Sequence, residues 1–132
     1  MSIKIYSAIL CDLVRTEDNG KHIIIGVYTG DIVFTKCPTT FRTTLWLEME
    51  PWIKNGGMPF DIRLEATRQK KPVVMDGEMK IADEDRALLV LLMPVTTITS
   101  PGEYTPSLRK RDRRWQKIIS KAVELLSVHP PA

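Results

Sequence analysis

Asp61 and the triplet Glu78-Met79-Lys80 come closest to a catalytic pattern in this chain. A carboxylate on one strand and a Glu-x-Lys sequence on the next could hold Mg²⁺ and place a lysine beside a scissile phosphate. The pattern is permissive, because any strand with one face in water alternates polar and apolar residues in this way. Such nuclease chemistry usually sits on a sheet flanked by helices, whereas this chain is rich in strand patterns. A metal-dependent hydrolase is therefore the third of three functions that we consider.

A basic segment from Arg109 to Lys117 is the second candidate for chemistry. Its six basic residues are Arg109, Lys110, Arg111, Arg113, Arg114 and Lys117. Asp112 is the one acid among them, so the segment is strongly basic within a chain whose total charge is +3. Positive charge beside Trp115 and Tyr104 could bind phosphates and stack a base, as in sites for single-stranded nucleic acid. Solvated charge at the tip of a hairpin explains the same residues, so polyanion binding is an alternative and not the favoured function.

No other group of residues has the spacing of an active site or a metal site. His22 and His129 are far apart in the sequence, and Cys11 and Cys37 lack the spacing of zinc ligands. The chain also lacks a phosphate-binding loop, a dinucleotide fingerprint and a nucleophile elbow. We therefore expect no catalytic residues, no metal and no cofactor. Cys11 lies inside an apolar run, so we expect it to be a buried free thiol.

Length and composition are those of an ordinary globular protein. The 132 residues are 43% hydrophobic and 27% charged, so we expect one domain over residues 1–132, with a terminal tail at 128–132. The N-terminus lacks the pattern of a signal peptide, and no apolar run approaches the roughly 18 residues that cross a membrane. Because the cysteines do not form a disulfide framework either, we expect a cytoplasmic protein without membrane contact.

An antiparallel hairpin is the first element predicted to position these residues. Two β-rich apolar runs flank the polar residues 16–21, which contain Asn19-Gly20. Both residues tolerate the positive φ of tight hairpin turns, so the sequence predicts a turn at this point and favours an all-β fold.

Alternation of apolar and polar residues predicts further strands along the chain. It is present in residues 41–50 and 60–67, as expected for half-buried antiparallel strands. Residues 73–81 alternate without a phase break through Gly77, which predicts one strand with a bulge or close backbone approach there and a turn at 68–72. Residues 87–95 are nearly all apolar, and we interpret them as a central strand covered on both faces.

The C-terminal segment from Trp115 is ambiguous. Its apolar residues have the spacing of an amphipathic helix, which the periodicity favours. The competing interpretation is a hairpin that turns at residues 111–113, with residues 115–125 as the last strand.

The N-terminal third resembles a family of small uncharacterised bacterial proteins. The resemblance depends on the segments Leu10-Cys11-Asp12-Leu13-Val14-Arg15, Asn19-Gly20-Lys21 and Ile25-Gly26-Val27-Tyr28. It continues more weakly through Pro101-Gly102-Glu103-Tyr104 to Trp115. The resemblance implies a compact β-sandwich without an assigned activity, and it makes residues 115–123 the closing strand. Leu13 stands where that family often has an acidic residue.

We therefore predict an all-β chain folded as a single antiparallel β-sandwich of about seven or eight strands, with a C-terminal strand and a short helix as its alternative. The favoured function is a non-catalytic binding or assembly module that acts through self-association or a protein partner. Trp46 interrupts the polar face of residues 41–50, and Trp52 lies in a loop ending in Gly-Gly, so both are candidate partner-binding residues. A two-fold homodimer is the expected assembly.

Overall fold

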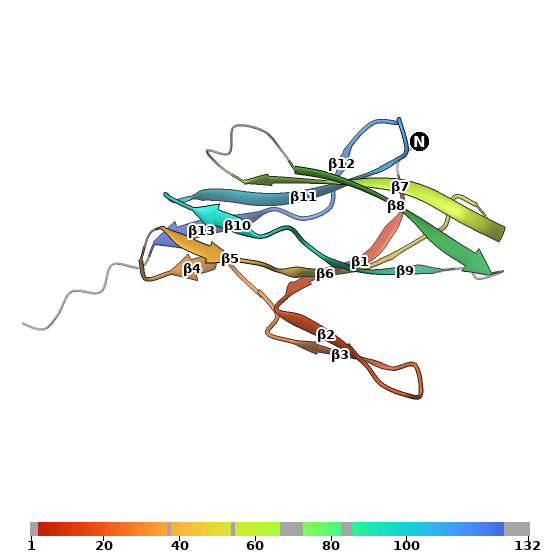
Figure 1. The fold of residues 1–132 in the computed structure, drawn as a ribbon, viewed down its shortest axis with the longest axis horizontal. Helices are drawn as coiled ribbons and strands as arrows, with labels where there is room; N and C mark the ends of the chain where they lie inside the picture. Colours follow the sequence, from red (N-terminus) through yellow and green to blue (C-terminus); the bar gives the residue numbers. More distant parts are fainter. Residues whose placement is uncertain (1–2, 37, 54, 67–72, 83–85, 126–132) are drawn as a thin grey trace, which may run out of the picture.

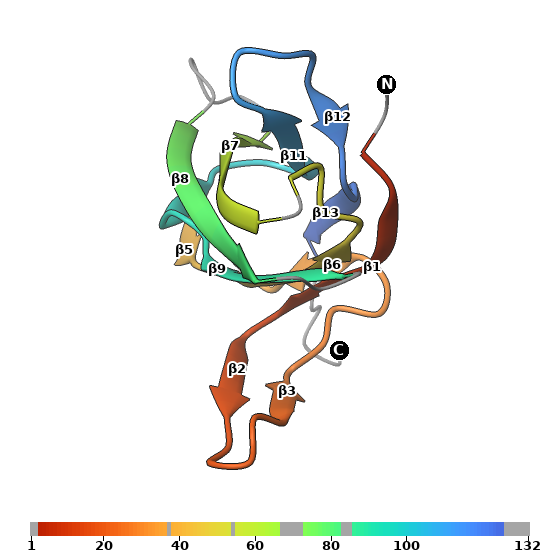
Figure 2. The ribbon, with the colours of Figure 1, turned by 90° about the vertical axis from the view of Figure 1, so that its right-hand side faces the viewer.

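The chain folds into two layers of β-sheet with a hairpin that projects from one of them (Figures 1 and 2). This is a computed structural model that describes residues 3–36, 38–53, 55–66, 73–82 and 86–125. All thirteen regular elements within these ranges are β-strands. No helix long and apolar enough to cross a membrane occurs in the same ranges.

The smaller layer, which we call sheet A, contains three antiparallel strands. In spatial order they are β1 (Ile5–Cys11), β6 (Thr44–Met49) and β9 (Ala87–Leu92). Alternation decides which side chains are buried: Leu10 and Leu45 are cross-strand partners that face the core, whereas Trp46 faces outward between Ile9 and Val90. The outer face of sheet A is thus more apolar than a solvent-facing sheet requires.

The larger layer, which we call sheet C, lies across the core from sheet A (Figure 2). Its strands in spatial order are β4 (Ile32–Phe34), β13 (Lys121–Leu125), β11 (Gly102–Lys110), β7 (Asn55–Ala66) and β8 (Val73–Ala82), with β12 (Gln116–Lys117) paired to β11. Strands β13 and β4 run parallel, and the other pairs of this sheet are antiparallel. Parallel pairing is possible here because most of the chain separates the two strands.

Two further strand pairs flank the layers. Strands β5 (Thr39–Phe41) and β10 (Thr96–Ile98) form one pair, and β2 (Leu13–Thr16) and β3 (His22–Ile25) form the projecting hairpin (Figure 1). The hairpin follows β1 directly, so it leaves the molecule on the sheet A side.

The hairpin turns through Gly20, as predicted. The amide of Gly20 donates to the carbonyl of Glu17 over 2.9 Å, and the amide of Glu17 donates to the carbonyl of Lys21 over 2.8 Å. Gly20 has a φ of 83°, whereas Asn19 is not among the positive-φ residues of the described chain. This is a tight turn followed by a left-handed glycine, and only the glycine needs conformational freedom.

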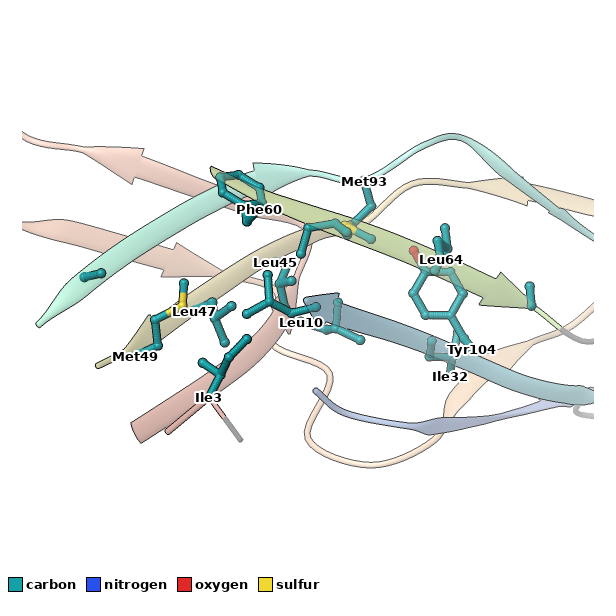
Figure 3. Close-up of a cluster of buried hydrophobic side chains, with 14 of the residues drawn as sticks. Ile3, Leu10, Ile32, Leu45, Leu47, Met49, Phe60, Leu64, Met93 and Tyr104 are labelled. Carbon is teal, nitrogen blue, oxygen red and sulfur yellow. The ribbon is translucent and has the colours of Figure 1, made fainter. Parts of the chain in front are cut away.

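The core lies between the two sheets and is drawn in Figure 3. Leu45, Leu47 and Met49 of β6 face residues such as Phe60 and Leu64 of β7, and all five are at most 5% exposed. A cross-layer hydrogen bond of 2.8 Å joins the hydroxyls of Tyr104 on β11 and Thr43, both fully buried. That bond satisfies polar groups that burial would otherwise penalise. The fold therefore combines apolar packing with a specific polar link between layers.

Several sequence predictions are confirmed. The described chain is all-β, and residues 115–125 contain strands β12 and β13 in place of the helix that periodicity favoured. Strand β8 continues through Gly77, where an added Cβ would lie 2.8 Å from the ring of Phe60, so the backbone does approach closely there. The strand count exceeds seven or eight because short strands of two to four residues complete the sheets. Cys37, the turn expected at 68–72 and the tail at 128–132 lie outside the described residues.

One interpretation is wrong. Residues 87–95 do not form a central strand covered on both faces, because β9 is the edge strand of sheet A. Its alternate residues Leu88, Val90 and Leu92 are 40%, 39% and 54% exposed. A continuous apolar composition cannot distinguish a strand buried by its own chain from one whose outer face is open.

Replacing Gly20 by valine should destabilise the protein by about 1 kcal/mol or more, because a β-branched residue is strained at positive φ. No atom of the surroundings lies within 4 Å of an added Cβ, so the cost is conformational. Gly30→Val is the matched control, since Gly30 is in equally open space without a positive φ. Denaturant titration of both variants measures the difference, and equal stability would contradict the turn assignment.

Cys11 should react slowly with a thiol reagent in the native protein and rapidly after unfolding. Its side chain is fully buried, and its sulfur donates to the carbonyl of Thr44 over 3.5 Å. Burial raises the pKa of the thiol, so little thiolate is present at neutral pH. Time-resolved labelling of a Cys37→Ser chain with and without denaturant checks this, and rapid native labelling of Cys11 would contradict it.

Candidate functional site

The basic segment begins at the end of β11 and lies beside a buried carboxylate on the outer face of sheet C. The β11–β7 register places Arg109 directly opposite Asp61. Arg109 Nε donates to Asp61 Oδ2 over 2.7 Å, and Arg111 Nε lies 3.5 Å from Asp61 Oδ1. Asp61 is only 5% exposed. The alternation of residues 60–67 predicted a solvated Asp61, and that expectation is wrong because the two arginines cover it.

The two arginines also decide the charge of Asp61. Burial by itself would raise the pKa of Asp61, but the hydrogen bond from Arg109 and the charges of Arg109 and Arg111 outweigh it. The pKa of Asp61 is therefore below its ordinary value of 3.8. This carboxylate is ionised and paired, so its oxygens are committed to arginines.

Trp115 folds back over the same outer face. The chain reverses at Asp112, which has a φ of 62°, and the amide of Arg113 donates to the carbonyl of Lys110 over 2.9 Å. The Trp115 ring then receives two guanidinium groups, with Arg63 Cζ at 4.6 Å and Arg109 Cζ at 4.2 Å from its centroid. These cation–π contacts make the tryptophan part of a cover over sheet C.

The remaining basic residues do not share one surface role. Lys110 Nζ lies 5.8 Å from the centroid of the Trp52 ring. Arg113, Arg114 and Lys117 are exposed. The predicted polyanion-binding residues therefore fall into a group that is paired with other side chains and a group that is exposed. The Trp115 ring contacts arginine side chains, so it is not free to stack on a base.

The structure does not place Asp61 and Glu78 directly opposite each other, and the Lys80 side chain lies outside the described part of the chain. Asp61 is opposite Asp76 on β8, whereas Glu78 is opposite Pro59. The Glu78 carboxylate lies over Gly57, where an added Cβ would collide with it. No group of three or more His, Cys, Asp or Glu side chains suited to a metal ion occurs in the described parts of the chain. The Asp61 carboxylate is thus paired with two arginine side chains.

The two candidate partner-binding tryptophans occupy different environments. Trp46 is half-buried on the outer face of β6, and its Nε1 donates to Nδ1 of His22 over 3.1 Å. Trp52 is half-buried and packs against the core, which suits a plug over the end of the sandwich. Trp46 is therefore the one that lies beside the projecting hairpin.

Three residues of the N-terminal signature meet at the base of that hairpin. The Tyr28 hydroxyl donates to Asp12 Oδ1 over 3.0 Å, and the Asp12 amide lies 3.1 Å from the carbonyls of both Ile25 and Gly26. Burial, and next the hydrogen bond to Asp12, raise the pKa of Tyr28 to about 12. Gly26 has a φ of 72°, and a Cβ there would collide with the Asp12 carboxylate. These residues hold the hairpin in place at the end of β1.

Exposed apolar side chains on the projecting hairpin and on β9 are the feature that the sequence interpretation missed. Of the twelve exposed large hydrophobic residues in the described chain, eight belong to the hairpin and its exit or to β9 and its exit. They are Leu13, Ile23, Ile25, Val27, Leu88, Val90, Leu92 and Val95. The sequence signal was present as the uncharged run from residue 87 to 95, but it was interpreted as internal burial.

Comparison with known proteins gives a family and no activity. A protein-family model described as a family of unknown function (DUF6941) matches residues 6–119. No curated protein matches the chain.

Asp61→Asn should lower the free energy of unfolding at neutral pH by about 2 kcal/mol, because the charged hydrogen bond from Arg109 and the ion pair with Arg111 are lost. The matched control is Asp76→Asn: its side chain is opposite Asp61, 80% exposed and 3.8 Å from Arg111, so little change is expected.

The difference between these variants should depend on pH. Because the folded-state pKa of Asp61 is lowered, its contribution is complete above the ordinary value of 3.8 and is lost as the pH falls below it. Denaturant titrations at pH 7 and near pH 3 measure this, and an Asp61→Asn penalty that persists unchanged at low pH would contradict the ion-pair role.

Proposed function

The chain belongs to DUF6941, a family of unknown function, and we propose that it is a non-catalytic assembly module that acts by self-association. The supporting observation is the row of exposed apolar side chains along the outer face of β9, formed by Leu88, Val90 and Leu92. Exposed apolar residues scattered singly need no explanation, but a contiguous group marks an interaction surface.

The positions of these residues on β9 support a role in an intermolecular contact. Leu88, Val90 and Leu92 occupy successive outward positions of one strand, and all are at least 39% exposed. On the facing layer, Trp115 and its two arginines cover the outer side of β7 and β11. A second subunit would give β9 a comparable cover.

A polar group lies at one end of this row. At the start of β9, Arg86 donates to Glu48 over 2.7 Å and lies 4.1 Å from the centroid of the Tyr6 ring. An apolar centre with a polar border is the usual composition of a protein–protein interface.

The two alternative functions have less support. Polyanion binding by residues 109–117 would depend on Arg113, Arg114 and Lys117, since Arg109 and Arg111 are paired with Asp61. A hydrolase would need Asp61 to exchange those arginines for a metal ion. Breaking that buried ion pair is a cost that self-association through exposed residues does not require.

Light scattering at micromolar concentration tests self-association. We expect a mass near twice the 15.1 kDa of the chain. Leu92→Glu should return the mass to that of one chain, because a charge would be placed in an apolar contact. Val74→Glu on β8 is the matched control, since Val74 is 53% exposed and Leu92 54%, and it should leave the mass unchanged.

A mass of 15.1 kDa at every concentration would overturn the proposed function. Thermal unfolding of Leu92→Glu and Val74→Glu shows whether either change acts through folding. Equal melting temperatures with different masses would assign the effect to the interface.

A further inference from the structure

Resting on the proposed function, we infer that the partner at β9 is a second copy of this chain, bound by antiparallel pairing of β9 with β9 about a two-fold axis at Val90. The two sheets A would then form one continuous six-stranded sheet. The inference depends on three features of β9: its free edge, its lack of charge and its symmetric sequence.

The free edge of β9 is available for another strand. Sheet A has the order β1-β6-β9, so β9 pairs with β6 on one side, and no strand of the described chain pairs with the other side. An open edge presents unpaired main-chain groups that can add a strand from another molecule.

The edge lacks the features that normally prevent such pairing. Natural edge strands carry charges, prolines, bulges or very short lengths that block association. Strand β9 has six residues, Ala87-Leu88-Leu89-Val90-Leu91-Leu92, none of them charged or proline, and its register with β6 is regular. Pro94 lies beyond the strand. An unprotected apolar edge is retained where pairing is part of the assembly.

The sequence of β9 also identifies the partner. Residues 88–92 read Leu-Leu-Val-Leu-Leu, which is the same in both directions about Val90. In an antiparallel two-fold pair centred on Val90, Leu88 lies opposite Leu92 of the second copy, and Val90 lies opposite itself. A two-fold interface requires such self-complementarity, whereas an unrelated partner strand does not.

Pairing in this register keeps the two faces of the sheet consistent. Directly opposite residues of antiparallel strands point to the same face. The outward residues Leu88, Val90 and Leu92 would meet their counterparts outside, and the inward residues Leu89 and Leu91 would continue the core side. A register shifted by one residue would place outward leucines against inward ones.

The outer row of sheet A would also become continuous across the axis. Ile9, Trp46 and Val90 are direct cross-strand neighbours on this face. Pairing at Val90 joins the two rows end to end. Trp46 thus lies one strand from the axis, which gives the candidate partner-binding tryptophan a place beside the contact.

Cysteine substitution tests the register. Each variant also carries Cys37→Ser, so that the introduced cysteine and the buried Cys11 are the two thiols of the chain. Val90→Cys should form a covalent dimer under mild oxidation, because facing Cβ atoms lie about 4.5–5.5 Å apart across antiparallel strands. Leu88→Cys alone should not, since its two copies would be four residues apart along the strand, about 13 Å. A mixture of Leu88→Cys and Leu92→Cys chains should cross-link.

A charge exchange provides a second test that needs no oxidation. If Leu92→Glu dissociates the protein, adding Leu88→Lys in the same chain should restore the dimer, because the two substituted positions face each other twice across the axis. Adding Val73→Lys instead is the control, since Val73 is 37% exposed on the other sheet and Leu88 40%. The Val73→Lys chain should remain monomeric.

The outcomes separate the two proposals. A dimeric protein whose Val90→Cys chain fails to cross-link, or whose Leu88→Cys chain cross-links equally well, keeps self-association and overturns pairing at Val90. A protein that is monomeric at every concentration overturns both. Selective cross-linking at Val90 together with rescue by Leu88→Lys supports both.

Discussion

A two-layer sandwich encloses one interior, so each sheet has an outer face that something else must cover or that water must tolerate. The two sheets of this protein solve that problem differently. In sheet C, Trp115 returns over β7 and β11, where it is held by Arg63 and Arg109. Sheet A receives only partial cover from the hairpin, through the Trp46–His22 hydrogen bond, and keeps exposed leucines and valine along β9.

The same contrast explains why the basic segment is a weak functional candidate although it is the most charged part of the chain. A buried carboxylate is stable when opposite charges compensate it, and Asp61 obtains a charged hydrogen bond from Arg109 and an ion pair with Arg111. Two of the six basic residues are therefore structural. The charge that the sequence displays as a block is divided in space between a buried ion pair and an exposed turn.

Several residues of the N-terminal signature serve to position the hairpin. Asp12, Gly26 and Tyr28 form a hydrogen-bonded junction at its base, and Gly26 has no room for a side chain beside the carboxylate. This junction fixes where the hairpin leaves sheet A, and with it the outward course of Leu13, Ile23 and Ile25. These residues of the N-terminal signature thus help to determine which apolar side chains of the hairpin reach the surface.

By itself the sequence determined the all-β class, the turn at Gly20 and the strand through Gly77, because these depend on local backbone preference and on a period of two. It could not decide the C-terminal segment, where helical spacing yielded to pairing with β11 and β4. Nor could it show that Asp61 is buried, or that β9 lies at an edge. Those properties depend on strand order, which joins residues such as Asp61 and Arg109 across 48 positions and leaves no trace in local periodicity.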